Sequence, residues 1–250
     1  MGNIYASGFS ANKVWDGIIY HHSHDNITPL AGPKFLWDAR ISSLITLEGA
    51  NSVTAWADYY QGKILNQYFG PDVSKAPTYE VVSGIQTVHF NGVNNYLASY
   101  PFGETSSDFT IFVVVTDLQT NMAVDNGQIF FIFNGGDNID MEYVAMNQIG
   151  TVISGVDMGL FLAQPKQIMA VRISGGTVGK VYQNGGTPST QAVSMTGVDF
   201  LGLGSFIGNR YLYGNIPCVA YYDSALSDVD MNTAFSYAGA AFGITVTPVS

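Results

Sequence analysis

One run of the sequence has residue types and spacing that could do chemistry, at positions 137–142 (DNIDME). Successive side chains of a β-strand point to opposite faces, so Asp140 and Glu142 would share one face if this run is a strand. Two carboxyl groups a short distance apart can act as general acid and nucleophile in the hydrolysis of a glycosidic bond. The run therefore raises the possibility of a glycan-cleaving enzyme.

The surrounding residues weaken that interpretation. Glucanases with a β-sandwich fold carry an E-x-D-x-x-E pattern, and here Asn138 stands where its first glutamate would be. Gly135 and Gly136 precede the run, and adjacent glycines are typical of a turn. We therefore predict a solvated turn followed by an edge strand, and no catalytic residues.

The other candidate centres are less well formed. His21, His22, His24 and Asp25 could hold a transition metal, but their spacing suits no tetrahedral site and no cysteine lies nearby. His89 has no nucleophile motif such as G-x-S-x-G to work with, so no Ser-His-Asp triad is indicated. Calcium remains possible as a cofactor through scattered carboxylates that form no alternating acidic loop, namely Asp58, Asp117, Asp125, Asp137 and Asp223. We predict no metal site from these residues.

Sugar recognition needs aromatic faces for stacking, with amides or carboxylates that bond to hydroxyl groups. Residues of these types in predicted loops form a candidate carbohydrate-binding set: Asp58, Tyr59, Tyr60, Asn94, Asn95, Asn209, Arg210, Tyr211 and Tyr213. Tyr96 is a further candidate or a core residue. Tyrosine and asparagine serve protein–protein contacts equally well, so composition alone does not separate the two uses.

Composition excludes several classes of protein. The chain has 250 residues, of which 47% are apolar and 11% charged, so it can bury a sizeable core. Its net charge of −10 opposes binding to nucleic acid or to an anionic membrane. The single cysteine, Cys218, leaves no internal disulfide and is expected to be buried. The apolar stretch at 111–115 is far shorter than the ~20 residues of a membrane helix, and the first residues lack the features of a signal peptide.

Hydrophobic patterning predicts short strands. We expect them at 87–90, followed by a hairpin-type turn at Asn91-Gly92, and at 109–115, 128–133, 168–173 and 179–183. The segment 109–115 is apolar at nearly every position and should be a central strand. One helix is expected, capped by Ser227 and stopped near Gly243. Residues 1–33 are polar and read as an arm or attachment segment, and 34–250 as one domain.

Two stretches resemble the laminin G-like jelly rolls of the concanavalin A-like superfamily. The first combines FLWDA at 35–39, VTAWAD at 53–58, APTY at 76–79 and VHFNGVNNYL at 88–97. The second combines LYGNI at 212–216 with YYDSALSD at 221–228. The resemblance spans about residues 35–245 and implies an all-β, two-sheet antiparallel jelly-roll sandwich with one short C-terminal helix. Asn91, Asn94 and Asn95 stand where relatives often carry aspartate, which weakens any calcium site.

The resemblance, together with the few charges, the missing signal peptide and the polar arm, implies a non-enzymatic virion surface protein, a decoration, fibre or adhesion module of a bacteriophage. It would be made in the host cytoplasm, dock on other virion proteins through residues 1–33 and bind a host surface glycan or a neighbouring virion protein as part of an oligomer or larger assembly. Two alternatives stay open. One is a glycoside hydrolase using Asp140 and Glu142, and the other is a purely structural coat protein with no ligand.

Overall fold

The computed structural model describes residues 32–67, 72–118, 127–144, 148–205 and 210–250, together with the backbone of two short strands near the N-terminus. Those two strands, β1 (Lys13–Trp15) and β2 (Ile18–Tyr20), pair with each other. Most of the predicted arm, including its histidine cluster, lies outside the described residues.

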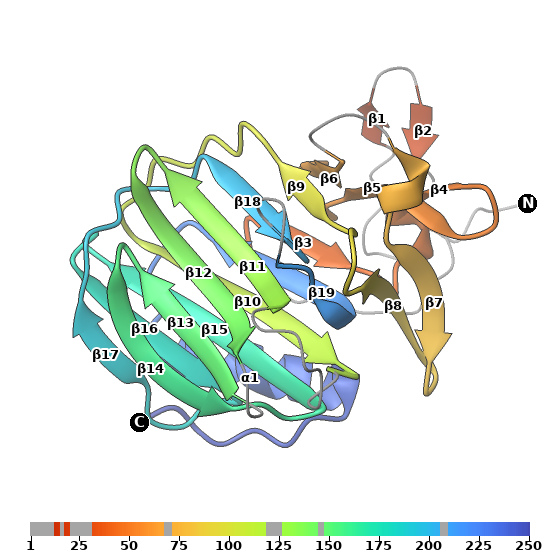
Figure 1. The fold of residues 1–250 in the computed structure, drawn as a ribbon. Coiled ribbons are helices and arrows are strands. Elements are labelled where there is room, and N and C mark those ends of the chain that lie inside the picture. The colour runs from red at the N-terminus through yellow and green to blue at the C-terminus, as the bar shows by residue number, and fades with distance from the viewer. Residues whose placement is uncertain are drawn as a thin grey trace, which may run out of the picture.

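The described chain is all-β and antiparallel with one C-terminal α-helix, as the sequence predicted (Figure 1). The strands of the first half are β3 (Phe35–Asp38), β4 (Ile45–Glu48), β5 (Ser52–Ala57), β6 (Ile64–Asn66), β7 (Thr78–Val82), β8 (Ile85–Asn91), β9 (Leu97–Ser99) and β10 (Phe109–Thr116). Those of the second half are β11 (Gly127–Asn134), β12 (Asp137–Val144), β13 (Gln148–Ile153), β14 (Val156–Leu162), β15 (Lys166–Ser174), β16 (Val178–Gln183), β17 (Ser189–Ala192), β18 (Phe200–Leu203) and β19 (Tyr213–Tyr222). The helix is α1 (Asp228–Phe242), and two short 3-10 turns lie at Ser42–Leu44 and Val73–Lys75.

The strands form two series of hydrogen-bonded neighbours. In the first series β10 lies between β15 and β19, β16 and β17 extend it beyond β15, and β3, β8 and β7 extend it beyond β19. In the second series the order is β14, β13, β12, β11, β18, β9, β6, β5, β4. A single pairing of Ser52 with Thr78 joins the two series.

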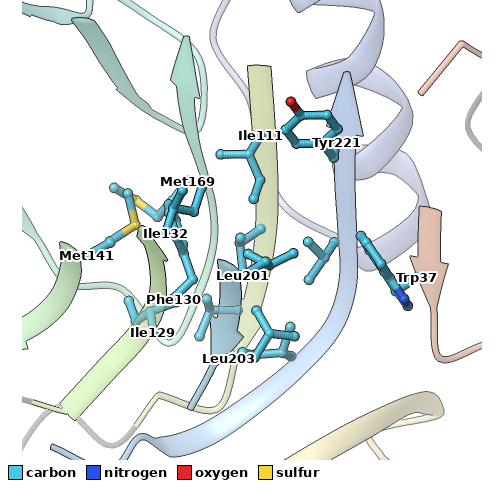
Figure 2. Packing of buried hydrophobic residues seen from close by; sticks show 14 of the residues in the cluster. Trp37, Ile111, Ile129, Phe130, Ile132, Met141, Met169, Leu201, Leu203 and Tyr221 are labelled. Carbon is cyan, nitrogen blue, oxygen red and sulfur yellow. The ribbon is translucent and has the colours of Figure 1, made fainter. Parts of the chain in front are cut away.

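The inward faces of both series enclose one apolar core (Figure 2). Trp37 and Ile111 enter it from the first series, and Ile132, Met141 and Leu201 from the second. Strand β10 is buried at every position, as its apolar sequence predicted. It is covered on both sides because its alternate residues belong to the core and to a second cluster beneath α1.

Helix α1 ends as its sequence predicts. The Ser227 hydroxyl accepts a hydrogen bond from the Asp230 backbone N–H, 3.2 Å away, which satisfies a donor of the first turn. At the other end Gly243 adopts a left-handed conformation with φ of 66°, which glycine allows without strain. The apolar side of the helix then packs on β10, β15 and β19 through Phe235, Ala234 and Met231.

One local prediction is wrong. The turn after β8 was expected to close a hairpin, but β8 pairs with β7 and β19, whereas β9 pairs with β18 and β6. The Asn91 side chain instead accepts backbone N–H groups of Val93 and Asn94, 2.9 and 3.1 Å away. This side-chain turn sends the chain from one series of strands to the other. No helix among the described residues is long and apolar enough to cross a membrane.

Candidate functional site

Strand β12 carries the two carboxylates on its outward face. Ile139 and Met141 point into the core, so Asp140 and Glu142, which alternate with them, point away from it. The turn from β11 is made by Gly135 and Gly136 in left-handed conformations. The predicted edge strand is in fact internal, because β12 pairs with β11 on one side and β13 on the other.

Arg210 joins the two carboxylates. Its Nη1 lies 2.6 Å from Oε2 of Glu142 and 3.3 Å from Oδ2 of Asp140. The two carboxylate oxygens that contact this one nitrogen can therefore be no more than about 6 Å apart. The Arg210 side chain is 45% exposed, whereas those of Asp140 and Glu142 are 16% and 18% exposed. The guanidinium thus lies over a carboxylate pair that is largely shielded from solvent.

Gln128 fixes the position of Asp140 from the neighbouring strand. Its Nε2 donates a hydrogen bond of 2.6 Å to Asp140 Oδ1, and its backbone N–H donates to the Arg210 carbonyl at 3.2 Å. The register pairs Gln128 with Glu142 across the two strands. The Gln128 side chain is buried, and its Oε1 has no partner among the described residues. This one residue therefore ties Asp140 and the segment of Arg210 to the same strand.

The environment favours the protonated form of both acids. Burial is the main cause that raises the pKa of Asp140, while the Gln128 hydrogen bond and the Arg210 charge oppose it. Burial also raises the pKa of Glu142, and the adjacent Asp140 charge raises it further against the opposing effect of Arg210. Of the two acids, Glu142 is the one whose pKa is raised by the charge of the other as well as by burial.

Small and apolar residues surround the pair on the neighbouring strands. Val152 lies opposite Asp140 on β13, and Gly150 lies opposite Glu142. Gly150 has no side chain to place beside Glu142, and it is itself buried. On the other side Phe131 and Phe200 form a small cluster, with ring centroids 6.4 Å apart. No described helix covers this face of the strands.

The predicted carbohydrate-binding set is not gathered into one site. Asp58 is buried, with a carboxylate that accepts backbone N–H groups of Tyr60, Gln61 and Lys63 and so holds a turn. Burial raises its pKa against those hydrogen bonds. Tyr59 and Tyr60 meet edge to face beside it, 5.1 Å apart. These three residues build a loop on the side of the molecule that packs against α1.

The remaining members of the set lie elsewhere. Asn95 is buried and donates to the Ala76 carbonyl, and Asn94 donates to the Ser74 carbonyl. Tyr213 is 37% exposed and lies against His89. Tyr211 is half-buried beside the β11 strand, to which it forms a bridge at Gln128. Asn209 lies outside the described residues. Of the described members of the set, the structure brings only Arg210 to the carboxylate pair.

Sequence patterns did not identify two partners of the pair. Gln128 had been considered only as a strand residue, and Arg210 only as a possible sugar ligand. Their approach to β12 depends on pairing that joins segments 12 and 68–70 residues apart. The polar residue at the start of an otherwise apolar strand was the one available signal for Gln128.

Metal ligands do not gather in the described part of the chain, where no three His, Cys, Asp or Glu side chains could hold a metal ion together. Asp125, one of the residues considered for calcium, lies outside the described residues. So does the cluster considered for a transition metal, which comprises His21, His22, His24 and Asp25.

Comparison with known proteins gives similarity at the level of the fold. No protein-family model matches the sequence, and no curated protein matches it significantly. A Trypanosoma rangeli sialidase in complex with a difluoro-KDN aligns with a TM-score of 0.56 and 16% identity, over 83% of this chain and 33% of the sialidase. The same sialidase in complex with the inhibitor DANA aligns with a TM-score of 0.55 and 16% identity, over 83% of this chain and 33% of the sialidase. Domain 4 of a Geobacillus stearothermophilus GH43 arabinanase, in complex with arabinotriose, gives 0.49 and 16%, over 64% of this chain and 81% of that domain.

These findings correct the predicted function. The interpretation as a non-enzymatic virion surface protein is wrong, and so is the prediction that the chain is no enzyme, because the fold is shared with sialidases, which are carbohydrate-active enzymes. At this identity the similarity concerns the fold alone. The present chain spans about a third of the length of these sialidases.

Proposed function

We propose that this chain is the glycan-cleaving domain of a glycoside hydrolase, with Asp140 and Glu142 as its catalytic pair. The observation that carries the proposal is the contact of one Arg210 nitrogen with both carboxylates on the outward face of β12. A structural ion pair needs no second acid, whereas glycoside hydrolysis needs two acids with different tasks. The fold shared with sialidases supports the same class of enzyme.

The surroundings assign different roles to the two acids. Glu142 acts as the general acid, because burial and the neighbouring Asp140 charge raise its pKa and so favour its protonated form. Asp140 acts as the nucleophile, because the Gln128 hydrogen bond holds its carboxylate in place and, like the Arg210 charge, opposes the rise in its pKa that burial causes. Asp140 would bond to the anomeric carbon while Glu142 gives its proton to the departing glycosidic oxygen. Water then releases the sugar from Asp140 and returns a proton to Glu142.

The spacing indicates the stereochemical outcome. Retaining enzymes hold their carboxyl groups about 5–5.5 Å apart, and inverting enzymes about 6.5–9.5 Å apart, because a water must fit between them. The limit of about 6 Å set by Arg210 agrees with the retaining arrangement. We therefore expect hydrolysis with retention of anomeric configuration.

The substrate is expected to be a neutral glycan. With Glu142 protonated, the Asp140 carboxylate and the Arg210 guanidinium balance each other, and the whole chain carries −10. The site thus offers no excess of positive charge to a polyanionic saccharide, and the net charge of the chain would repel one. The fold that we propose to carry this site is the two-sheet jelly roll of the concanavalin A-like type. The two series of strands around one core and the helix on one outer side support it.

A reducing-sugar assay tests the proposal. The full chain is incubated with a panel of neutral polysaccharides, together with Glu142→Gln and the control Asp137→Asn, which removes a carboxylate from the same strand outside the pair. We expect new reducing ends from the wild type and Asp137→Asn, and a loss of at least about 100-fold in Glu142→Gln. Activity that survives in Glu142→Gln, or no cleavage of any member of the panel, would overturn the proposal.

A further inference from the structure

The side-chain amide of Gln128 has two ends, and only one of them is paired. Its Nε2 donates a hydrogen bond of 2.6 Å to Asp140 Oδ1. The NH₂ end faces Asp140 because an ionised carboxylate can only accept. The carbonyl end, Oε1, is buried and finds no donor among the described residues, in a side chain that is 3% exposed. A buried acceptor without a donor is costly, so a donor for Oε1 is to be sought nearby.

The register places Glu142 beside that carbonyl end. Gln128 and Glu142 lie directly opposite each other on β11 and β12. Side chains in such a position have Cβ atoms about 4.5–5.5 Å apart. Arg210 contacts Oε2 of Glu142, which leaves Oε1 of the same carboxyl for another contact. Ionised Glu142 carries acceptors only, whereas protonated Glu142 carries an O–H donor. Protonation of Glu142 therefore supplies the donor that Gln128 lacks.

The other groups around the pair do not treat its two acids differently in this way. Arg210 contacts both and lowers the pKa of each. Besides Arg210, the described residues beside the pair or Gln128 are Phe131 of β11, Gly150 and Val152 of β13, Tyr211 of the segment before β19 and, one strand further, the exposed Asp157 of β14. Gln128 is thus the neighbour whose two ends favour opposite protonation states.

We propose that Gln128 is a positioning residue that holds the pair in one mixed state, with Asp140 ionised and Glu142 protonated. The inference rests on the proposed function for the roles of the two acids. In this state Nε2 donates to the Asp140 carboxylate and Oε1 accepts from the Glu142 carboxyl. The reverse state would set a proton of Asp140 against an N–H donor and leave Oε1 facing an ionised Glu142. Gln128 thereby assigns the nucleophile and the general acid.

Carboxyl titration by NMR tests this assignment on the full chain, labelled with ¹³C at the Asp and Glu carboxyl groups. In the wild type we expect Asp140 to titrate at a lower pH than Glu142. Gln128→Met keeps the length of the side chain and removes both hydrogen-bonding ends. It should move the titration of Asp140 up and that of Glu142 down, each by about one pH unit or less.

Gln148→Met is the matched control, because Gln148 lies on β13, where it pairs with Val144 and not with either acid. It should leave both titrations in place. Shifts in opposite directions separate the proposed role from general loosening of the site. Burial raises the pKa of both acids, so loosening would lower both. The proposal is overturned if only Asp140 shifts in Gln128→Met, if both acids shift in the same direction, or if neither shifts.

A wild-type measurement covers the case in which Gln128→Met does not fold. The side-chain N–H signals of Gln128 should respond when Asp140 titrates, and its carbonyl carbon should respond when Glu142 titrates. A carbonyl carbon that is insensitive to Glu142 would overturn the proposal.

Kinetics then connect the amide to catalysis. Activity needs Asp140 ionised and Glu142 protonated, so the two limbs of the pH profile of reducing-sugar release should move towards each other in Gln128→Met. The titration itself needs no substrate. Opposite shifts in a chain that cleaves no glycan would overturn only the proposed function, whereas cleavage without opposite shifts would overturn only the role of Gln128.

Discussion

The two outward faces of this molecule are both built from antiparallel strands, but they differ in the polarity of their side chains and in whether a helix covers them. On β10, β15 and β19 the outward residues are apolar, among them Phe112, Ile168 and Ala220, and α1 covers them. On β12 the outward residues are Asp140 and Glu142, and no described helix covers them. Burying large apolar side chains stabilises the fold, while two adjacent carboxylates cost stability, which fits the catalytic role that we propose for them. The comparison separates a face that stabilises the fold from the face that we propose acts on a glycan.

The largest expected effect is on the covered face. Phe235 is 1% exposed and packs against Phe112 and Tyr182, with ring centroids 5.1 and 6.2 Å away. We expect Phe235→Ala to lower the free energy of unfolding by about 3–5 kcal/mol, because it leaves a cavity beneath α1. Urea denaturation measures this change. Val229→Ala, on the exposed side of the helix, should change stability by less than about 0.5 kcal/mol. A loss below about 1 kcal/mol in Phe235→Ala would contradict the assigned role of α1.

A smaller effect is expected when Arg210, the cation that contacts both acids, is replaced. Arg210 lowers the pKa of both acids, so Arg210→Gln should raise both. Activity needs Asp140 ionised and Glu142 protonated, so both limbs of the pH profile should move to higher pH, by about one unit or less. The pH dependence of reducing-sugar release measures the shift. Lys75→Gln, which removes a cation paired with Asp72 instead, should leave the profile in place. A shift to lower pH would contradict the assigned electrostatics.

The smallest effect is the pH dependence of stability. The pKa of Glu142 is raised in the folded protein, so between its ordinary value of 4.5 and its folded value the folded state binds more protons than the unfolded state. The free energy of unfolding should therefore fall as the pH rises through that interval. Glu142→Gln removes this contribution and should flatten the dependence by about 1 kcal/mol or less. Chemical denaturation at a series of pH values from 4 to 7 measures it. An unchanged slope in Glu142→Gln, with Asp137→Asn as control, would contradict burial as the cause.

The sequence predicted the elements of the fold better than their partners. Alternation and glycine turns located β10, β11, β15 and β16, and the capping residues Ser227 and Gly243 located α1, because these signals are local. The run at 137–142 was recognised as a strand with two carboxylates on one face. Its internal position was missed, since strand order depends on pairings between distant segments.

The candidate site was predictable only in part, for the same reason. Asp140 and Glu142 share a face through a spacing that sequence shows. Arg210 reaches them from the segment that leads into β19, which is distant in the sequence. Gln128 bonds to Asp140 from β11, whose register with β12 shifts between Gln128 and Phe130. Asp58 and Asn95 were chosen for their chemical type, but both are buried, where their polar groups bond to the backbone.

The most direct test of the account is to trap the sugar on the enzyme. The full chain is incubated with 2-deoxy-2-fluoro glycosyl fluorides of the common neutral sugars, which form the covalent intermediate of a retaining enzyme but release it slowly, and the mass of the protein is then measured. We predict an added mass of one fluorosugar on the peptide that contains Asp140, and none in Asp140→Asn. An unmodified wild type with every reagent, or a sugar attached elsewhere, would contradict the assignment of β12 as the acting face.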